Sequence, residues 1–206
     1  MNVETRTASA VDSAGVTLAV PDPVPVELDP RTTALLVMDI TDPLCVKRPS
    51  CVASVPRIAS LIARTRTSGA RVIYTIGPKE PTVILREVSP SGAEPVIRGR
   101  ADKFFGTDLH GILRGAGITT VVVVGTAANG AVLYSSFAAN LRGYSVVVAA
   151  DAISADTAQV EDVVRWQLLN QPGYSNAGNE PLMPERVTLS AVDLISFREV
   201  GGKAPA

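Results

Sequence analysis

Hydrophobic and polar segments alternate most clearly in the centre of the chain. Four valines at positions 121–124 follow one another without a polar residue between them, which is typical of a strand buried on both faces of a parallel sheet. Small and apolar side chains then recur at helical spacing over residues 131–141, and Gly143 follows as a helix stop. A second β-branched run occupies residues 145–148. Residues 119–151 are therefore predicted to form a β-α-β unit.

Short apolar runs and amphipathic repeats continue on both sides of this unit. The further strands are predicted at residues 33–39, 71–76 and 187–189, and the further helices at residues 52–67, 107–115, 157–170 and 191–197. Strands that alternate with helices through short connections are typical of a doubly wound α/β sheet, which carries helices on both faces. Such sheets place their chemistry beyond the carboxyl ends of the strands. We therefore expect the functional site at the turns that follow the strands.

Two segments interrupted by prolines fit no regular element. Residues 1–30 carry four prolines in their last ten positions, which predicts an extended N-terminal arm. The arm would lie against a neighbouring subunit or form a poorly ordered tail. Residues 77–99 are expected to form a solvated loop or a lid, with a short hairpin that joins residues 83–85 to residues 95–97.

Composition narrows the class of protein. A chain of 206 residues with 46% hydrophobic residues can bury one sizeable core, so a single domain is expected over residues 31–206. A net charge of −1 without a basic stripe disfavours nucleic acid and membrane surfaces as partners. The chain begins without the pattern of a secretory signal and has no apolar run long enough to span a bilayer. Cys45 and Cys51 are expected to be reduced thiols, which favours a cytoplasmic location.

Asp39 is the first residue whose position suggests chemistry. It ends the buried strand at residues 33–39, where an unpaired charge would cost several kcal/mol. Asp39 should therefore have a cationic partner or a proton to transfer, although it could also cap the next loop as a structural hydrogen-bond acceptor. Three cations, Arg98, Arg100 and Lys103, lie close together further along the chain.

Three segments together resemble a known family. They are LLVMDITD at residues 35–42, KFFGTDLHGILRGAGITTVVVVG at residues 103–125 and AVLYSSFAANLRGYSVVVAADA at residues 131–152. Their order and spacing are similar to those of the isochorismatase-like hydrolase superfamily, which includes nicotinamidases, N-carbamoylsarcosine amidohydrolases and isochorismatases. The resemblance covers roughly residues 31–197. It implies a three-layer, doubly wound sheet of about six mainly parallel strands, and hydrolysis of a small-molecule substrate.

The resemblance also implies where the catalytic residues of the family's amidases would lie. Those enzymes use an Asp-Lys-Cys set, in which the Asp and the Lys keep the Cys reactive as a thiolate. The Asp matches Asp39, the position of the Lys holds Arg98, and the position of the Cys holds Ala131. A methyl group cannot attack a carbonyl, so thioester catalysis at Ala131 is excluded.

Three explanations of the missing thiol remain open. The first is hydrolysis without a Cys, as in the isochorismatases, whose Asp protonates a vinyl ether carbon before water completes the reaction. Asp39 would then be the acid or the base, Lys103 could replace the family's Lys, and Arg98 or Arg100 could clamp a carboxylate. The second is a binding or scaffold protein that kept its pocket. The third, an engineered inactivation, is disfavoured because Arg98 departs from the family pattern too.

Further side chains complete the predicted site. The predicted catalytic residues are Asp39, Lys103 and Arg98, and the predicted substrate-binding residues are Leu44, Phe104, Thr126, Asn129, Gly130, Ala131 and Tyr134. Backbone amides of residues 129–131 are expected to receive negative charge at the helix start. The family resemblance implies a non-proline cis peptide bond at 126–127 or 127–128.

Other nucleophiles and a metal are less well supported by the sequence. Cys45 could reach the pocket but more commonly such a residue is a small hydrophobe, while Ser135 and Ser136 have no evident His partner. No metal is expected, because the metal-binding nicotinamidases need a His after the second strand and this region has none. The single His110 is expected to be exposed or half-exposed.

Cofactor and partner predictions follow the same pattern. A dinucleotide is not indicated, because no G-x-G-x-x-G motif follows the first strand, and no cofactor is expected. The superfamily's members are commonly oligomeric, so a homo-oligomer is expected. The apolar stripe from Val160 to Leu168 around Trp166 would serve either a subunit contact or the core.

Overall fold

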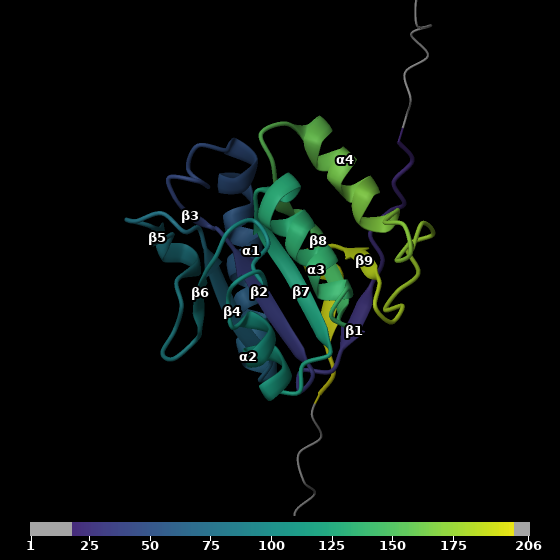
Figure 1. Ribbon diagram of the computed structural model, residues 1–206, viewed down its shortest axis with the longest axis horizontal. Coiled ribbons are helices and arrows are strands. Elements are labelled where there is room, and N and C mark those ends of the chain that lie inside the picture. The colour runs from purple at the N-terminus through teal and green to yellow at the C-terminus, as the bar shows by residue number, and fades with distance from the viewer. Residues whose placement is uncertain (1–17, 200–206) are drawn as a thin grey trace, which may run out of the picture.

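Six parallel strands form the central sheet of the computed structural model, which describes residues 18–199. Across the sheet their order is β6-β4-β2-β7-β8-β9, and every neighbouring pair is parallel (Figure 1). The strands are β2 (Thr33–Met38), β4 (Arg71–Ile76), β6 (Val96–Arg98), β7 (Thr120–Thr126), β8 (Ser145–Ser154) and β9 (Val187–Ser190). The predicted fold class, a doubly wound α/β sheet, is confirmed.

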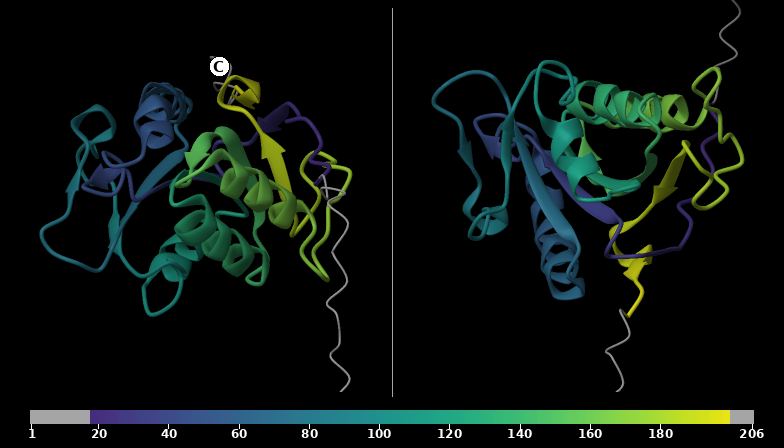
Figure 2. Two further views of the ribbon diagram at one scale, coloured as in Figure 1. Left: turned by 90° about the horizontal axis from the view of Figure 1, so that it is seen from above. Right: turned by 60° about the horizontal axis from the view of Figure 1, so that its bottom comes forward.

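Helices cover both faces of the sheet (Figure 2). Helix α1 (Pro49–Ser68) packs on one face, and α2 (Leu109–Gly115), α3 (Leu133–Asn140) and α4 (Ala158–Leu169) pack on the other. Strand β2 shows how the sequence serves both layers, since Leu35 and Val37 contact the α1 side whereas Leu36 and Met38 contact the opposite side. A strand with apolar residues at every position can be buried only in this way.

Helix ends follow the expected local signals. Gly69 ends α1 in the left-handed conformation with a φ of 81°, and the Thr157 side chain caps the first turn of α4. The helix expected at residues 131–141 begins with a π-helical segment, η2 (Ala128–Val132), in which Gly130 leaves helical backbone angles. The stripe on α4 that could have served a subunit contact instead places Val164 and Leu168 in the core.

The hairpin expected within residues 77–99 does not form. Strand β5 (Val83–Ile84) pairs antiparallel with β3 (Thr41–Asp42), and β6 pairs parallel with the central β4. A short turn, η1 (Arg86–Val88), separates them. Both apolar runs were recognised correctly as strands, but their partners are distant in sequence, so a local pattern could not identify them.

The two ends of the described chain pair with each other. Residues 191–197 form one 3₁₀ turn, η3 (Val192–Leu194), followed by strand β10 (Ile195–Phe197), so the closing helix was predicted incorrectly. Strand β1 (Val26–Leu28) pairs parallel with β10. The last part of the predicted N-terminal arm therefore packs on its own chain, and the rest of the arm, residues 1–17, lies outside the described residues.

Cys45 and Cys51 form a disulfide, which corrects the expectation of reduced thiols. Their Cα atoms lie 5.2 Å apart, because α1 begins at Pro49 and brings Cys51 back over the preceding loop. Cys45 is consequently no thiolate candidate in this state. The argument for a cytoplasmic location from reduced cysteines is also lost. Within residues 18–199, no helix combines the length and apolar character needed to cross a membrane.

Candidate functional site

A buried ion pair lies at the carboxyl edge of the central sheet. Asp39 follows the last residue of β2, and the Lys103 ammonium lies 2.8 Å from both of its carboxylate oxygens. The side chain of Lys103 is 1% exposed and also donates to the carbonyl oxygens of Ile76 and Gly99. The expected cationic partner of Asp39 is thus Lys103, which approaches from the loop before α2.

The backbone of Asp39 is held in an uncommon conformation. Its φ of 55° lies in the left-handed region, which Asp tolerates better than most residues. The Asp39 N–H donates to the Thr75 carbonyl at 2.9 Å, and the Asp39 carbonyl accepts from the Thr41 N–H at 2.8 Å. Left-handed non-glycine residues held by neighbouring hydrogen bonds are concentrated at functional sites.

Burial raises the pKa of Asp39 above its ordinary value, and the Lys103 ammonium lowers it without cancelling that effect. The carboxyl group can therefore keep a proton at a higher pH than an exposed aspartate would. This property suits a group that exchanges a proton with a substrate or with water.

Ser135 anchors the loop that carries Lys103. Its hydroxyl oxygen accepts from the Lys103 N–H at 3.0 Å and donates to the Ala101 carbonyl at 3.2 Å. On the other side of the loop, the Thr107 hydroxyl donates to the Lys103 carbonyl at 2.6 Å. Lys103 is consequently held at its backbone from both directions while its ammonium reaches Asp39.

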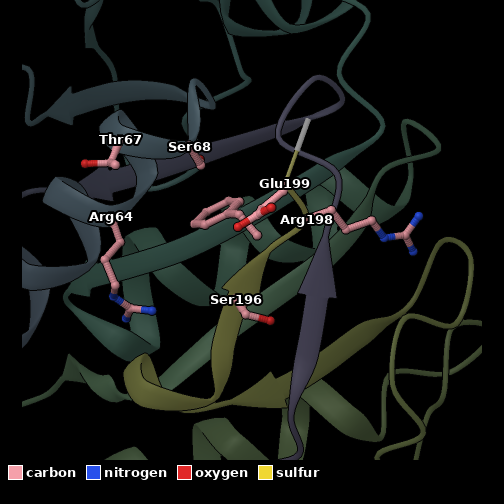
Figure 3. A pocket seen from close by; sticks show the side chains of 7 residues that line it. Arg64, Thr67, Ser68, Ser196, Arg198 and Glu199 are labelled. Carbon is pink, nitrogen blue, oxygen red and sulfur yellow. The ribbon is translucent and has the colours of Figure 1, made fainter. Parts of the chain in front are cut away.

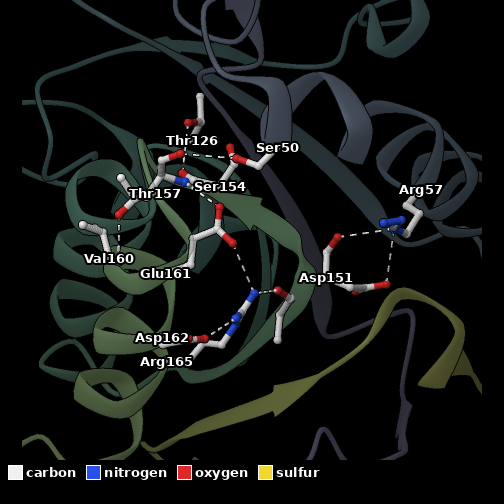
Figure 4. Close-up of polar contacts among 12 residues, drawn as sticks. Ser50, Arg57, Thr126, Asp151, Ser154, Thr157, Val160, Glu161, Asp162 and Arg165 are labelled. Atoms are coloured by element: carbon white, nitrogen blue, oxygen red, sulfur yellow. Dashed lines mark hydrogen bonds and ion pairs between the residues drawn. The ribbon is translucent and has the colours of Figure 1, made fainter. Parts of the chain in front are cut away.

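Gly125 allows β7 to pass close to the end of β2. Its φ is 129°, and a Cβ atom at this position would lie 2.0 Å from the Met38 carbonyl oxygen. Only glycine fits at this position. The carbonyl that it approaches belongs to Met38, the residue before Asp39 on the neighbouring strand. The next peptide bond but one, Thr126–Ala127, is cis, as the family resemblance implied. Thr126 itself is buried, and its hydroxyl donates to the Ser154 carbonyl at 3.1 Å (Figure 4).

A cavity of about 460 Å³ opens beside the ion pair. It is lined by Asp39, Leu44, Arg48, Gly77, Pro78, Gly99, Arg100, Ala101, Lys103, Ala127 and Ala131. Five of the residues proposed from the sequence therefore lie on one cavity, namely Asp39, Leu44, Arg100, Lys103 and Ala131. Ala131, at the position where the resemblance implied a Cys, is buried and lines this cavity.

Three of the proposed residues lie elsewhere. Arg98 forms an ion pair with Glu80 at 2.6 Å and donates to the carbonyls of Gly77 and Lys79, so its guanidinium does not reach Asp39. Phe104 is buried in the core and stacks on Tyr144. Thr126 is engaged by β8 and is not part of the cavity lining.

The helix start also differs from the expectation. Asn129 is exposed and does not line the cavity, and the Gly130 N–H already donates to the Ala127 carbonyl at 2.9 Å. Tyr134 is 57% exposed and borders a separate hollow on α3. None of the three predicted residues, Asn129, Gly130 and Tyr134, lines the cavity.

Arg48 is a lining residue that the sequence did not single out. It immediately precedes Pro49, the first residue of α1. Its Nη1 atom donates to the Leu44 carbonyl at 2.9 Å, and its Nε atom donates to Asp156 at 2.7 Å. Proline at the first helical position was the available signal, since it would have moved the helix start to Arg48.

A larger hollow of about 630 Å³ lies between the end of α1 and β10 (Figure 3). Its most prominent cation, Arg64, donates to the carbonyls of Val192 and Ile195 at 2.6 Å each. Because α1 leads directly into β4, this hollow lies toward the amino ends of the strands. Parallel sheets bind ligands at the opposite edge, so we do not regard it as the candidate site.

Metal ligands do not gather in the described part of the chain. Residues 18–199 contain no group of three or more His, Cys, Asp or Glu side chains placed to hold a metal ion. His110 is half-buried, and its Nδ1 atom lies 2.9 Å from the Tyr144 hydroxyl.

Comparison with known proteins identifies the family. The isochorismatase domain profile matches residues 33–171, and the chain belongs to the isochorismatase family, whose members are hydrolases. An uncharacterized isochorismatase family protein of Bacillus subtilis, YddQ, is 30% identical over 152 residues, which cover 65% of this chain and 83% of that protein.

Solved structures share the fold at lower identity. An N-carbamoylsarcosine amidase from Thermoplasma acidophilum has a TM-score of 0.64 at 23% identity, covering 79% of this chain and 97% of its own. A cysteine hydrolase from Pseudomonas syringae has a TM-score of 0.69 at 20% identity, covering 84% and 94%. A nicotinamidase from Staphylococcus aureus has a TM-score of 0.61 at 22% identity, covering 69% and 95%.

Proposed function

We propose that this protein hydrolyses a small molecule without a thiol nucleophile and that Asp39 transfers the proton. The observation that carries the proposal is the buried Asp39–Lys103 pair, which lines a cavity where Ala131 takes the place of a Cys. A buried ion pair without a functional role would be difficult to explain, because burying two charges costs several kcal/mol per ion. Membership of a hydrolase family supports the same reaction class.

Two reactions fit this set of residues. In the first, ionised Asp39 accepts a proton from water as the water oxygen attacks the carbon of a C–N bond, and it returns the proton to the leaving nitrogen as that bond breaks. In the second, protonated Asp39 donates to the carbon of a vinyl ether, and water then completes cleavage of the C–O bond. Lys103 orients the carboxyl group in both reactions and favours its ionised form. The raised pKa of Asp39 is compatible with either role.

The alternative is a binding module that kept the pocket but lost turnover. The specific observation in its favour is the same Ala131, since the position that would attack the substrate carries only a methyl group. In that case Asp39 and Lys103 would bind a ligand without changing it. A homo-oligomer and a cytoplasmic location are further proposals that do not depend on the choice between these functions.

A panel of amides, ureas and vinyl ethers separates the two functions. We expect the wild-type protein to hydrolyse at least one class, and Asp39→Asn to lower the rate about 100-fold or more, the range given for loss of general acid–base catalysis. Asp42→Asn serves as the matched control, because Asp42 is an exposed carboxylate three residues further on, outside the cavity lining. An unchanged rate in Asp39→Asn would remove this carboxyl group from the mechanism. Binding of a panel member without product would favour the binding module.

A further inference from the structure

The cavity beside Asp39 carries more positive than negative charge. Its lining contains three cations, Arg48, Arg100 and Lys103, and a single carboxylate, Asp39. Lys103 and Asp39 neutralise each other at 2.8 Å. The two guanidinium groups therefore determine the charge that a ligand meets in the rest of the cavity.

Arg48 is held in place on the wall of the cavity. Two of its nitrogen atoms are engaged, Nη1 by the Leu44 carbonyl and Nε by Asp156, and its side chain is only 20% exposed. Asp156 is 74% exposed and does not line the cavity. Within residues 18–199 the Arg48 Nη2 atom makes no hydrogen bond, so Arg48 is a pre-oriented cation with donor capacity left for a ligand.

Arg100, which also lines the cavity, supplies the second guanidinium group. It is exposed, and within residues 18–199 it makes no ion pair and no side-chain hydrogen bond. Arg98, two residues earlier, is in contrast bound by Glu80 and by the carbonyls of Gly77 and Lys79, and it does not line the cavity. The same short segment therefore holds one satisfied arginine and one that is available to a ligand.

We infer that the cavity selects a small organic oxyanion, whose anionic group lies between Arg48 and Arg100 while its reactive bond faces Asp39. Guanidinium groups match the planar oxygens of a carboxylate and also bind phosphate oxygens. The apolar side chains of Leu44, Pro78 and Ala131 line the same cavity and suit the organic part of the ligand. This inference rests on the proposed function, because it takes the Asp39 cavity as the reaction site.

Equilibrium binding tests the inference without requiring turnover. The probes are benzoate, phenyl phosphate and the neutral benzamide, titrated into the full-length protein by isothermal calorimetry at neutral pH and low salt. We expect at least one of the two anions to bind about tenfold tighter than benzamide, as one charge-assisted contact allows. The tighter of the two anions identifies the oxyanion, carboxylate or phosphate ester, that the site prefers.

Arginine variants locate the anion. Arg100→Gln should weaken binding of the preferred anion roughly 5- to 20-fold, a value below that of a buried charged hydrogen bond because Arg100 is exposed, and should leave benzamide unaffected. Arg48→Gln should act in the same direction. Arg98→Gln is the matched control and should change neither affinity. Thermal melting of each variant checks that the fold is kept.

The inference is overturned if benzamide binds as tightly as the anions, if none of the probes binds, or if Arg98→Gln weakens anion binding as much as Arg100→Gln does. Failure of the proposed function has a different signature. Anion binding lost in Arg100→Gln, combined with hydrolysis that is indifferent to Asp39→Asn, would keep the oxyanion site and discard the catalytic role of Asp39.

Discussion

Two ion pairs arise from one short segment, residues 98–103, and they have opposite surroundings. Lys103 pairs with Asp39 inside the protein, where the two side chains are 1% and 9% exposed. Arg98 pairs with Glu80 at the surface, where the side chains are 37% and 70% exposed. The sequence offered both cations as partners for Asp39. The difference shows that the burial of each cation, rather than its distance along the chain from Asp39, decides which of them can pair with Asp39.

The largest predicted effect is the loss of the buried cation. Lys103→Met should reduce the free energy of unfolding by about 3–5 kcal/mol at pH 7, because it leaves the Asp39 carboxylate buried without a partner. Arg98→Gln should cost no more than about 1 kcal/mol, as for other exposed pairs. Urea unfolding of both variants measures the contrast. Equal losses of unfolding free energy would mean that the buried Asp39–Lys103 pair stabilises the fold no more than the exposed Arg98–Glu80 pair does.

The pH dependence of the Lys103→Met variant sharpens this comparison. Burial raises the pKa of Asp39 in the folded state, and the cation that lowered it is now absent. A group whose pKa is higher in the folded state favours folding at low pH and loses that contribution as the pH rises through the folded pKa. The free energy of unfolding that Lys103→Met loses relative to the wild type should therefore become smaller as the pH falls toward the acidic range. A deficit independent of pH would contradict the assignment of its cause to Asp39.

The stability of the fold should depend nearly as strongly on the close approach of β7 to β2. Gly125→Ala places a methyl group 2.0 Å from the Met38 carbonyl oxygen in a left-handed backbone conformation, so a loss of about 2–5 kcal/mol is expected from overpacking and strain together. The matched control is Gly115→Ala in α2, where a Cβ atom meets nothing within 4 Å. Its unfolding free energy should stay within about 1 kcal/mol of the wild type. Thermal unfolding of the two variants provides the measurement.

Two neighbouring serines test how the Lys103 loop is held. Ser135→Ala removes both hydrogen bonds to the loop and should cost about 1–3 kcal/mol. Ser136→Ala is the control, since the Ser136 hydroxyl is buried yet has no partner within residues 18–199. A looser Lys103 would lower the pKa of Asp39 less, so NMR titration of the Asp39 carboxyl carbon should show a higher pKa in Ser135→Ala alone. Equal titration curves in both variants would limit Ser135 to a structural role.

A third ion pair, between Arg66 and Glu94, has an exposure between those of the other two. Burial raises the pKa of Glu94, but hydrogen bonds from Arg66 and from the Ser91 N–H lower it by more. A depressed pKa contributes stability above the unfolded value that is lost as the pH falls through the folded one. Glu94→Gln should therefore cost about 1 kcal/mol at pH 7 and less near pH 3. Urea unfolding at the two pH values measures this, and a loss that grows on acidification would contradict it.

The sequence predicted the central layers of the fold because they depend on local patterns. Valine runs and helix-stop glycines lie within one element each, so β7 and the helix after it were recognisable from a few residues. The pairings of β5 and β10 were missed because their partners, β3 and β1, are far away in sequence. The disulfide was missed for a related reason, since it depends on where α1 begins.

The candidate site was predictable only where the backbone is regular. Asp39 follows a strand directly, so its position at the sheet edge could be derived from the pattern alone. Lys103 lies in irregular backbone and Arg98 is the last residue of β6, so spacing did not determine the direction of either side chain, and the sequence could not choose between them. The π-helical segment before α3 was not predicted by the sequence pattern, and neither Asn129 in this segment nor Tyr134 in α3 lines the cavity.

The pH dependence of kcat/KM for the best substrate of the panel, measured for the wild type and for Asp39→Asn, tests the central claim most directly. The account predicts one limb whose midpoint lies above the ordinary aspartate pKa, roughly 3.9, and which is absent from Asp39→Asn. A rate that rises with pH through this midpoint would identify Asp39 as a base, and a falling rate would identify it as an acid. A profile that is the same in both proteins would contradict proton transfer by Asp39.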